Sequence, residues 1–110
     1  MMSKSSTTTK LSRPTGRIAT HPGEMLLEEF MKPLGLSANA LAGLLKVPAN
    51  RISDLVRGRR QVTADTALRL ARYFGTTPEL WLNLQTNHDL SKARAEIGHA
   101  IVEEIRPRAA

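Results

Sequence analysis

Apolar residues recur at intervals of three or four from His21 onward, and each such stretch is bounded by Pro, Gly, Ser or Thr. This interval places apolar side chains along one face of an α-helix, and no stretch shows the strict alternation that favours a half-buried strand. A chain of 110 residues has room for one small domain. The sequence therefore predicts an all-α fold of five helices.

The boundaries of these helices follow from residues that start or stop a helix. In chain order, the expected starts are Pro22, Ser37, Pro48, Thr63 and Thr77, and the expected ends are Pro33 with Gly35, Lys46, Gly58, Gly75 and about Glu104. The residues expected to face the core are Leu26, Leu27, Phe30, Leu34, Leu41, Ala42, Leu45, Ile52, Leu55, Val56, Ala67, Leu68, Ala71 and Phe74.

Composition divides the chain into three parts. Residues 1–20 are rich in Ser and Thr and have few large apolar residues, so we expect a flexible basic arm. Residues 21–90 are the expected helical domain, and residues 91–110 are a C-terminal helical extension and tail.

The absence of cysteine excludes disulfides, thiolate nucleophiles and zinc ribbons. No apolar run approaches the roughly 20 residues of a membrane span, and residues 1–20 lack the apolar segment of a secretory signal. We therefore expect a cytoplasmic protein with no membrane contact.

The formal charge of +6 is concentrated in the middle of the chain. Residues 43–72 hold seven Lys or Arg against two Asp, a balance of +5, and residues 1–20 add four bases without an acid. A polyanion such as nucleic acid would suit this segment, although a solvated basic surface has the same charge pattern.

The second and third expected helices, joined by a turn near Lys46, have the size of a helix-turn-helix, whose second helix enters the major groove of DNA. On the third helix the polar face lies opposite the apolar one and carries Asn50, Ser53, Asp54 and Arg57, at i, i+3, i+4 and i+7. An amphipathic helix with a merely solvated charged face is the alternative.

The side chains on this face suit contacts with base edges. Asn50 matches adenine, and Arg51 or Arg57 matches guanine. Asp54 either accepts a hydrogen bond from cytosine or holds the two arginines. The expected phosphate contacts are Ser37, Asn39, Arg59 and Arg60.

Several motifs together resemble the HigA-type antitoxins of the Xre, lambda-repressor-like helix-turn-helix family, over about residues 21–90. They are His21-Pro22-Gly23-Glu24, Leu34-Gly35-Leu36-Ser37, Leu41-Ala42, Val47-Pro48, Arg51-Ile52-Ser53, Arg57-Gly58-Arg59-Arg60, Thr63-Ala64-Asp65-Thr66-Ala67-Leu68-Arg69-Leu70-Ala71 and Pro78-Glu79-Leu80-Trp81-Leu82-Asn83-Leu84-Gln85.

The resemblance implies a five-helix DNA-binding domain that represses its own operon and binds a HigB toxin, a RelE-like ribosome-dependent mRNA endonuclease. By position, the family's base-facing residues are Ala49, Asn50, Arg51, Ser53, Asp54 and Arg57. One position departs from the superfamily, which often has Gln as the second residue of the second helix. Ala38 stands there, so the role of that Gln is missing or moves to Asn39.

Two apolar features lie near the C-terminus. Trp81 is expected to be a buried anchor, with a partner-binding hot spot as the alternative. Leu90, Ala93, Ile97, Ile101 and Ile105 form a stripe at helical spacing. Homodimerisation is the first candidate for this stripe, because two DNA half-sites require a two-fold protein. Toxin contact and folding back on the core are the alternatives.

No catalytic, metal or cofactor site is expected. His21, His88 and His99 are scattered, and no set of nucleophile, base and orienting residue can be assigned. We therefore expect a dimeric antitoxin and repressor, with no small-molecule substrate. A stand-alone regulator of the same fold is the alternative, and a protein-interaction module with an idle basic face is a third hypothesis.

Overall fold

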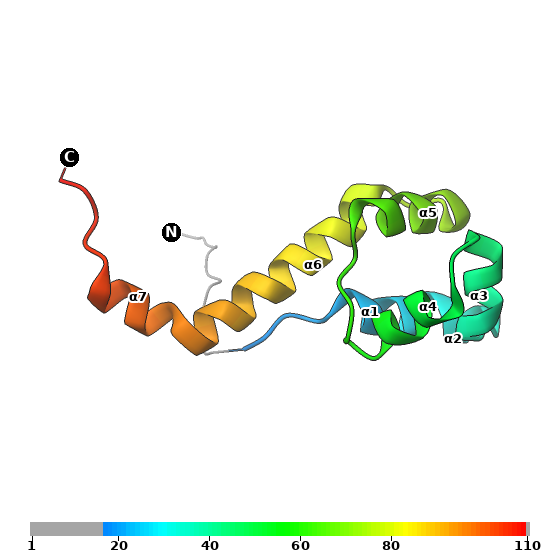
Figure 1. The fold of residues 1–110 in the computed structure, drawn as a ribbon, viewed down its shortest axis with the longest axis horizontal. Helices are drawn as coiled ribbons and strands as arrows, with labels where there is room; N and C mark the ends of the chain where they lie inside the picture. Colours follow the sequence, from blue (N-terminus) through cyan, green and yellow to red (C-terminus); the bar gives the residue numbers. More distant parts are fainter. Residues whose placement is uncertain (1–16, 110) are drawn as a thin grey trace, which may run out of the picture. The chain divides into compact units, whose positions relative to one another are not determined.

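The computed structural model describes residues 17–109, and within this range the regular structure is entirely helical (Figure 1). One compact unit covers Thr20–His88, and the rest of the described chain, residues 17–19 and 89–109, belongs to a second. Most of the expected basic arm, residues 1–16, lies outside the described residues. The all-α class with five continuous helical segments and a long C-terminal helix is confirmed for the described part of the chain.

The first helical segment consists of α1 (Pro22–Met25), a π-helical stretch η2 (Leu26–Met31) and α2 (Lys32–Leu34). The segment ends at the expected place, beside Pro33 and Gly35: Leu34 is its last helical residue, and Gly35 follows in the left-handed conformation at φ +66°. Pro33 follows, two residues on, a π-helical stretch that already departs from the α-helical bonding pattern that a proline ring disrupts.

The same stretch changes which side chains of the first segment are buried. Leu26 and Met31 are fully buried, a separation of five residues that fits the i to i+5 pattern of a π-helix. Leu34, expected in the core, is 60% exposed. An α-helical period therefore assigned the wrong residue to the end of this face.

The other helices are α3 (Ala38–Leu45), α4 (Ala49–Val56), α5 (Ala64–Phe74) and the C-terminal run of α6 (Pro78–Ala93), η3 (Arg94–Gly98) and α7 (His99–Glu104). The hydroxyl oxygens of Ser37, Thr63 and Thr77 accept hydrogen bonds from the backbone N–H groups of Ala40, Thr66 and Leu80, at 3.0, 3.4 and 3.2 Å. These contacts confirm the expected helix starts, because each satisfies a donor that the first turn leaves free.

The core of the Thr20–His88 unit joins all five segments. Its buried apolar residues are Leu26, Met31, Leu41, Ala42, Leu45, Ile52, Leu55, Val62, Ala67, Leu70 and Trp81. The expected inward position of Leu68 is wrong, since this side chain is 60% exposed. Leu70 lies on the buried face of α5 with Ala67 and Ala71, whereas Leu68 lies about 100° around the helix from Ala67.

Trp81 anchors α6 in this core. Its ring lies 5.1 Å from that of Phe30, between ring centroids, and Nε1 donates a hydrogen bond to Oγ1 of Thr76 at 2.8 Å. The side chain is 0% exposed, so the expected buried anchor is confirmed. The assignment of Trp81 to a dimer or toxin interface is corrected, because no part of its surface is free to meet a partner.

The loop between α4 and α5 is tied to α6 by a buried polar contact. Gln85, on α6, is 6% exposed, and its Oε1 accepts a hydrogen bond from the backbone N–H of Val62 at 2.8 Å. Val62 is itself buried, so this contact satisfies a donor that water does not reach.

Candidate nucleic-acid interface

Helices α3 and α4 pack against each other across a turn at residues 46–48, as a helix-turn-helix does. Lys46 adopts the left-handed conformation at φ +63°, and Pro48 is extended directly before α4. Ile52 and Leu55 fix one face of α4 in the core. The opposite face is therefore left for contact with another molecule, and the helix is of a size that enters a major groove.

The residues expected to contact bases lie on α4 or directly after it, and they differ in how exposed they are. Ala49, Asn50 and Arg57 are exposed, and Ser53 and Asp54 are partly exposed. Among residues 17–109, the side-chain amide of Asn50 and the guanidinium of Arg57 have no hydrogen-bond or ion-pair partner, so both are available to a ligand. Their contact with DNA bases stays a prediction.

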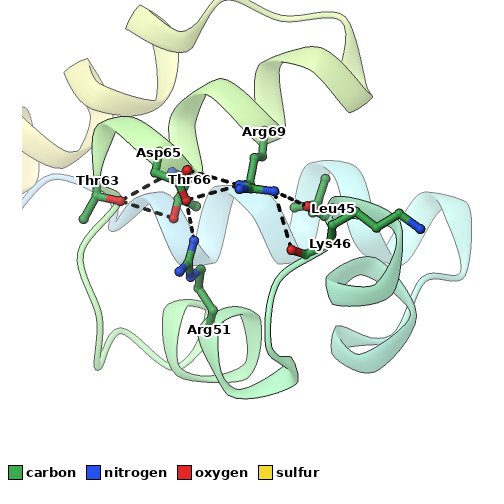
Figure 2. A network of polar contacts seen from close by, with 7 residues as sticks. All are labelled: Leu45, Lys46, Arg51, Thr63, Asp65, Thr66 and Arg69. Atoms are coloured by element: carbon green, nitrogen blue, oxygen red, sulfur yellow. Dashed lines mark hydrogen bonds and ion pairs between the residues drawn. The ribbon is translucent and has the colours of Figure 1, made fainter.

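Arg51 differs from these neighbours. Its guanidinium makes a hydrogen-bonded ion pair with the carboxylate of Asp65 on α5, and its side chain is 28% exposed (Figure 2). The side chain expected to contact a base is instead bound to another helix of the same protein.

Asp54 was expected to hold Arg51 or Arg57 if it did not contact a base. The structure places its carboxylate 4.0 Å from the guanidinium of Arg60 instead. The chain turns back at Gly58, where φ is +75°, and the backbone N–H of Arg59 donates to the carbonyl of Asp54 at 2.8 Å. This turn brings the basic residues that follow α4 close to its last turn.

The four residues expected to contact phosphates are all exposed: Ser37, Asn39, Arg59 and Arg60. Ser37 already accepts a hydrogen bond as the N-cap of α3, which leaves its O–H free to donate. Arg59 and Arg60 follow the C-terminal end of α4, where the helix dipole favours positive charge. Their phosphate contacts stay a prediction.

Asp65 is the centre of a polar network that the sequence did not reveal (Figure 2). Besides Arg51, it binds Nε of Arg69 through both carboxylate oxygens, at 3.2 and 3.1 Å. The hydrogen bond from Arg69, and next that from Arg51, lower the pKa of Asp65 below its ordinary value. The i to i+4 spacing of Asp65 and Arg69 was the available sequence clue.

Gly23 is a second position whose role was not evident from the sequence. A Cβ atom on Gly23 would lie 1.8 Å from the backbone oxygen of Leu55, so α1 contacts the backbone of α4 directly. Figure 1 shows α1 alongside α4. The imidazole Nδ1 of His21 accepts a hydrogen bond from the N–H of Gly23 at 2.9 Å and caps this helix. The His21-Pro22-Gly23 motif therefore supports the helix that is expected to enter DNA.

The C-terminal unit carries an apolar stripe along its helix. Leu90, Ile97, Ile101 and Ile105 are 46%, 52%, 44% and 63% exposed, and Ala93 is partly buried. Ile105 lies just after α7 in extended backbone. Three large apolar side chains exposed along one helical run, with a fourth directly after it, exceed what scattered surface residues explain and favour an interaction site.

Other types of site are not found in the described part of the chain. Between residues 17 and 109, no three His, Asp or Glu side chains are grouped as metal ligands. His99 and Glu103 form only an exposed i to i+4 pair at 3.1 Å. No described helix is both long and apolar enough to span a membrane.

Several known proteins are similar to this chain in amino-acid sequence. The helix-turn-helix family model HTH_3 matches residues 27–81. Virulence-associated protein I of Dichelobacter nodosus is 53% identical over 89 residues, which are 78% of this chain and 82% of that protein. The antitoxin HigA-1 of Vibrio cholerae is 43% identical over 82 residues (74% and 77%). A relative from Haemophilus influenzae, 47% identical over 74 residues (67% and 69%), is described only as an uncharacterised HTH-type transcriptional regulator.

Solved structures give the same result for the fold. A HigA-family addiction module antidote protein of Coxiella burnetii superposes with a TM-score of 0.79 at 48% identity, over 84% of this chain and 100% of that one. The antitoxin HigA of Pseudomonas aeruginosa, solved with the higBA promoter, has a TM-score of 0.79 at 44% identity, over 82% and 98%. This chain belongs to the Xre-type helix-turn-helix family, among the HigA-type antitoxins.

Proposed function

We propose that this protein is the antitoxin of a toxin–antitoxin pair, that it binds operator DNA as a dimer to repress its own operon, and that it neutralises a HigB/RelE-like mRNA endonuclease by direct binding. The proposal rests on the outward face of α4, which is the side of the helix opposite the buried Ile52 and Leu55. It presents Asn50 and Arg57 without partners in the described chain, and it is followed by Arg59 and Arg60. A similar antitoxin, HigA of Pseudomonas aeruginosa, is known in a complex with promoter DNA.

The dimer rests on a separate observation. An operator with two half-sites about one turn of DNA apart requires a protein with two-fold symmetry. The exposed stripe of Leu90, Ile97, Ile101 and Ile105 supplies an apolar face that a second copy of the chain could cover in a two-fold interface. Toxin binding at this stripe is the alternative use of the same surface.

Sequence-specific binding is tested with the DNA upstream of the gene for this protein. Wild-type protein should bind that duplex more tightly than a scrambled duplex, and the preference should weaken little with salt while both affinities fall. Asn50→Ala should cost about 1–3 kcal/mol on the upstream DNA and relax one base position, because the variant cannot make a bidentate contact to adenine. If both duplexes weaken equally in this variant, Asn50 contacts no base.

Toxin neutralisation is tested by expressing the open reading frame adjacent to the gene, alone and together with this protein. Growth arrest by the neighbour alone, relieved on co-expression and accompanied by co-purification, supports the antitoxin function. A harmless or unbound neighbour contradicts it.

The second candidate is a stand-alone transcriptional repressor of the same fold, without a toxin. The relative from Haemophilus influenzae favours it, since that protein is described only as a transcriptional regulator. Operator binding together with a harmless neighbour would select this candidate.

A further inference from the structure

A chain of three charged side chains joins every part of the helix-turn-helix to α5. Arg51 of α4 donates to Oδ2 of Asp65, and Arg69 binds both oxygens of the same carboxylate. Arg69 also donates from Nη1 to the carbonyls of Leu45 and Lys46, at 2.9 and 3.5 Å. Figure 2 shows this Asp65 network running from α4, through α5, to the end of α3.

The network determines where the Arg51 side chain goes. Arg51 lies directly after Asn50 and two residues before Ser53, both of which have side chains that could meet bases. An arginine without a partner at this point is suited to contact guanine or a phosphate, the commonest DNA contacts of that residue type. Asp65 instead holds the guanidinium against α5, leaving the side chain 28% exposed.

Resting on the proposed DNA-binding function, we propose that Asp65 is a positioning residue for sequence recognition: oriented by Arg69, it holds Arg51 away from the bases and fixes α4 relative to α5. Specificity then depends on the other residues of the outward face. Arg51 adds to the positive charge counted in the sequence without contributing to the preference for particular bases.

The charge state of Asp65 agrees with this role. Arg69 and Arg51 lower the pKa of Asp65, so the carboxylate is ionised at neutral pH and accepts charge-assisted hydrogen bonds from both arginines. Arg69 is held in turn by the carbonyls at the end of α3, which limits the freedom of the carboxylate that it binds.

The first test uses the protein without DNA. The Asp65 carboxyl is titrated by NMR in wild-type protein, in Arg51→Gln and in Arg57→Gln, the matched control that removes an arginine without a carboxylate partner in the described chain. Arg51→Gln should raise the pKa of Asp65, and Arg57→Gln should leave it unchanged. The same pKa for Asp65 in all three proteins overturns the proposal, whatever the result of the DNA experiments.

The second test selects binding sites from a random duplex library with wild-type protein and Arg51→Gln. The proposal expects both proteins to select the same sequence, because Arg51 contacts no base. A changed base preference at one position in Arg51→Gln overturns the proposal. If wild-type protein selects no sequence at all, the proposed repressor function fails, while the NMR titration still decides whether Asp65 holds Arg51.

The third test releases Arg51. Asp65→Asn should lower the ratio of affinities for selected and scrambled duplexes about tenfold. The released Arg51 can then contact duplexes of any sequence, and one arginine contact to DNA contributes about this factor. Glu29→Gln, which removes one exposed acid outside the network, should leave the ratio unchanged.

The double variant Asp65→Asn, Arg51→Gln separates positioning from simple loss of structure. It should recover most of the discrimination, because the released arginine is gone. A double variant that discriminates as poorly as Asp65→Asn, or worse, contradicts the proposal and assigns Asp65 a purely structural role.

Discussion

At the scale of single residues, the contact between Gly23 and Leu55 shows how an absent side chain positions a binding element. The backbone of α1 approaches α4 so closely that no Cβ fits between them. The clash would be with backbone atoms of Leu55, which cannot rotate out of the way as a flexible side chain can. Gly23 is thus required by packing, although it lies on a different helix from every residue expected to meet DNA.

We expect Gly23→Ala to destabilise the protein by about 1–3 kcal/mol, the usual cost of overpacking, because α1 and α4 must move apart. Gly43→Ala is the matched control, since a Cβ there meets nothing within 4 Å. It should stabilise α3 by about 0.5–1 kcal/mol, because alanine is the better helix former. Urea unfolding of both variants measures the difference, and equal stabilities would contradict the close approach.

A second prediction at this scale concerns Arg59. If this exposed side chain binds phosphate, Arg59→Ala should make the plot of log K against log salt shallower by about 0.9 for each phosphate that is no longer neutralised. The order of preferred sequences should stay the same, because phosphate contacts carry no sequence information. Arg94→Ala, which removes an equal charge from η3, is the control. An unchanged slope in Arg59→Ala would show that Arg59 contacts no phosphate.

At the scale of elements, α4 is held from two sides. Its apolar face is buried through Ile52 and Leu55, and its polar edge is tied to α5 through Arg51 and Asp65. The apolar contacts supply most of the stability, because the ion pair is solvent-exposed and such pairs contribute little. The ion pair has the directional geometry that apolar contacts lack, so it determines the direction of the Arg51 side chain on a helix whose face the core has already set.

The ion pairs of Asp65 make a small part of the protein's stability dependent on pH. The folded-state pKa of Asp65 is lowered, so its contribution to stability is present above the unfolded pKa of about 4 and is lost as the pH falls through the folded value. Wild type should therefore have a higher Tm than Asp65→Asn at about pH 7, and the difference should shrink by about pH 3. Thermal unfolding of both proteins across this range checks the sign. A difference that grows on acidification would contradict it.

At the scale of the whole molecule, the two units have different surfaces. The Thr20–His88 unit buries its apolar residues in one core, and the C-terminal unit exposes a row of isoleucines. Exposed apolar rows of this kind favour association with a partner. Within the proposed function the second copy of the chain is that partner, which couples the oligomeric state to DNA binding.

We expect Ile101→Asp to convert a dimer into a monomer, because it places a charge in the centre of the apolar stripe. Val102→Asp is the control, as it adds the same charge to the same helix at a position outside the stripe that is 77% exposed. Light scattering after size-exclusion chromatography measures the mass. If Ile101→Asp remains a dimer, the stripe is not the dimer interface, and its use in toxin binding is tested next.

The amino-acid sequence was enough to predict the five helical segments and the family. Helix ends depend on local chemistry, such as the hydroxyl of Ser37 and the left-handed Gly58, so they can be predicted without the tertiary structure. The amphipathic pattern of α4 likewise identified the face that the core leaves free. The motif resemblance added the family, which the comparisons confirmed.

Which of these side chains are free to bind could not be predicted from the sequence, because it depends on contacts between helices. Asp65 and Arg51 are fourteen residues apart, and Gly23 and Leu55 more than thirty, so their contacts depend on how helices pack and not on any local pattern. The π-helical turns before Pro33 changed the buried face in the same way, by altering the period on which the sequence prediction relied. Local propensities fix where helices begin and end, whereas packing fixes which residues of those helices remain free to bind.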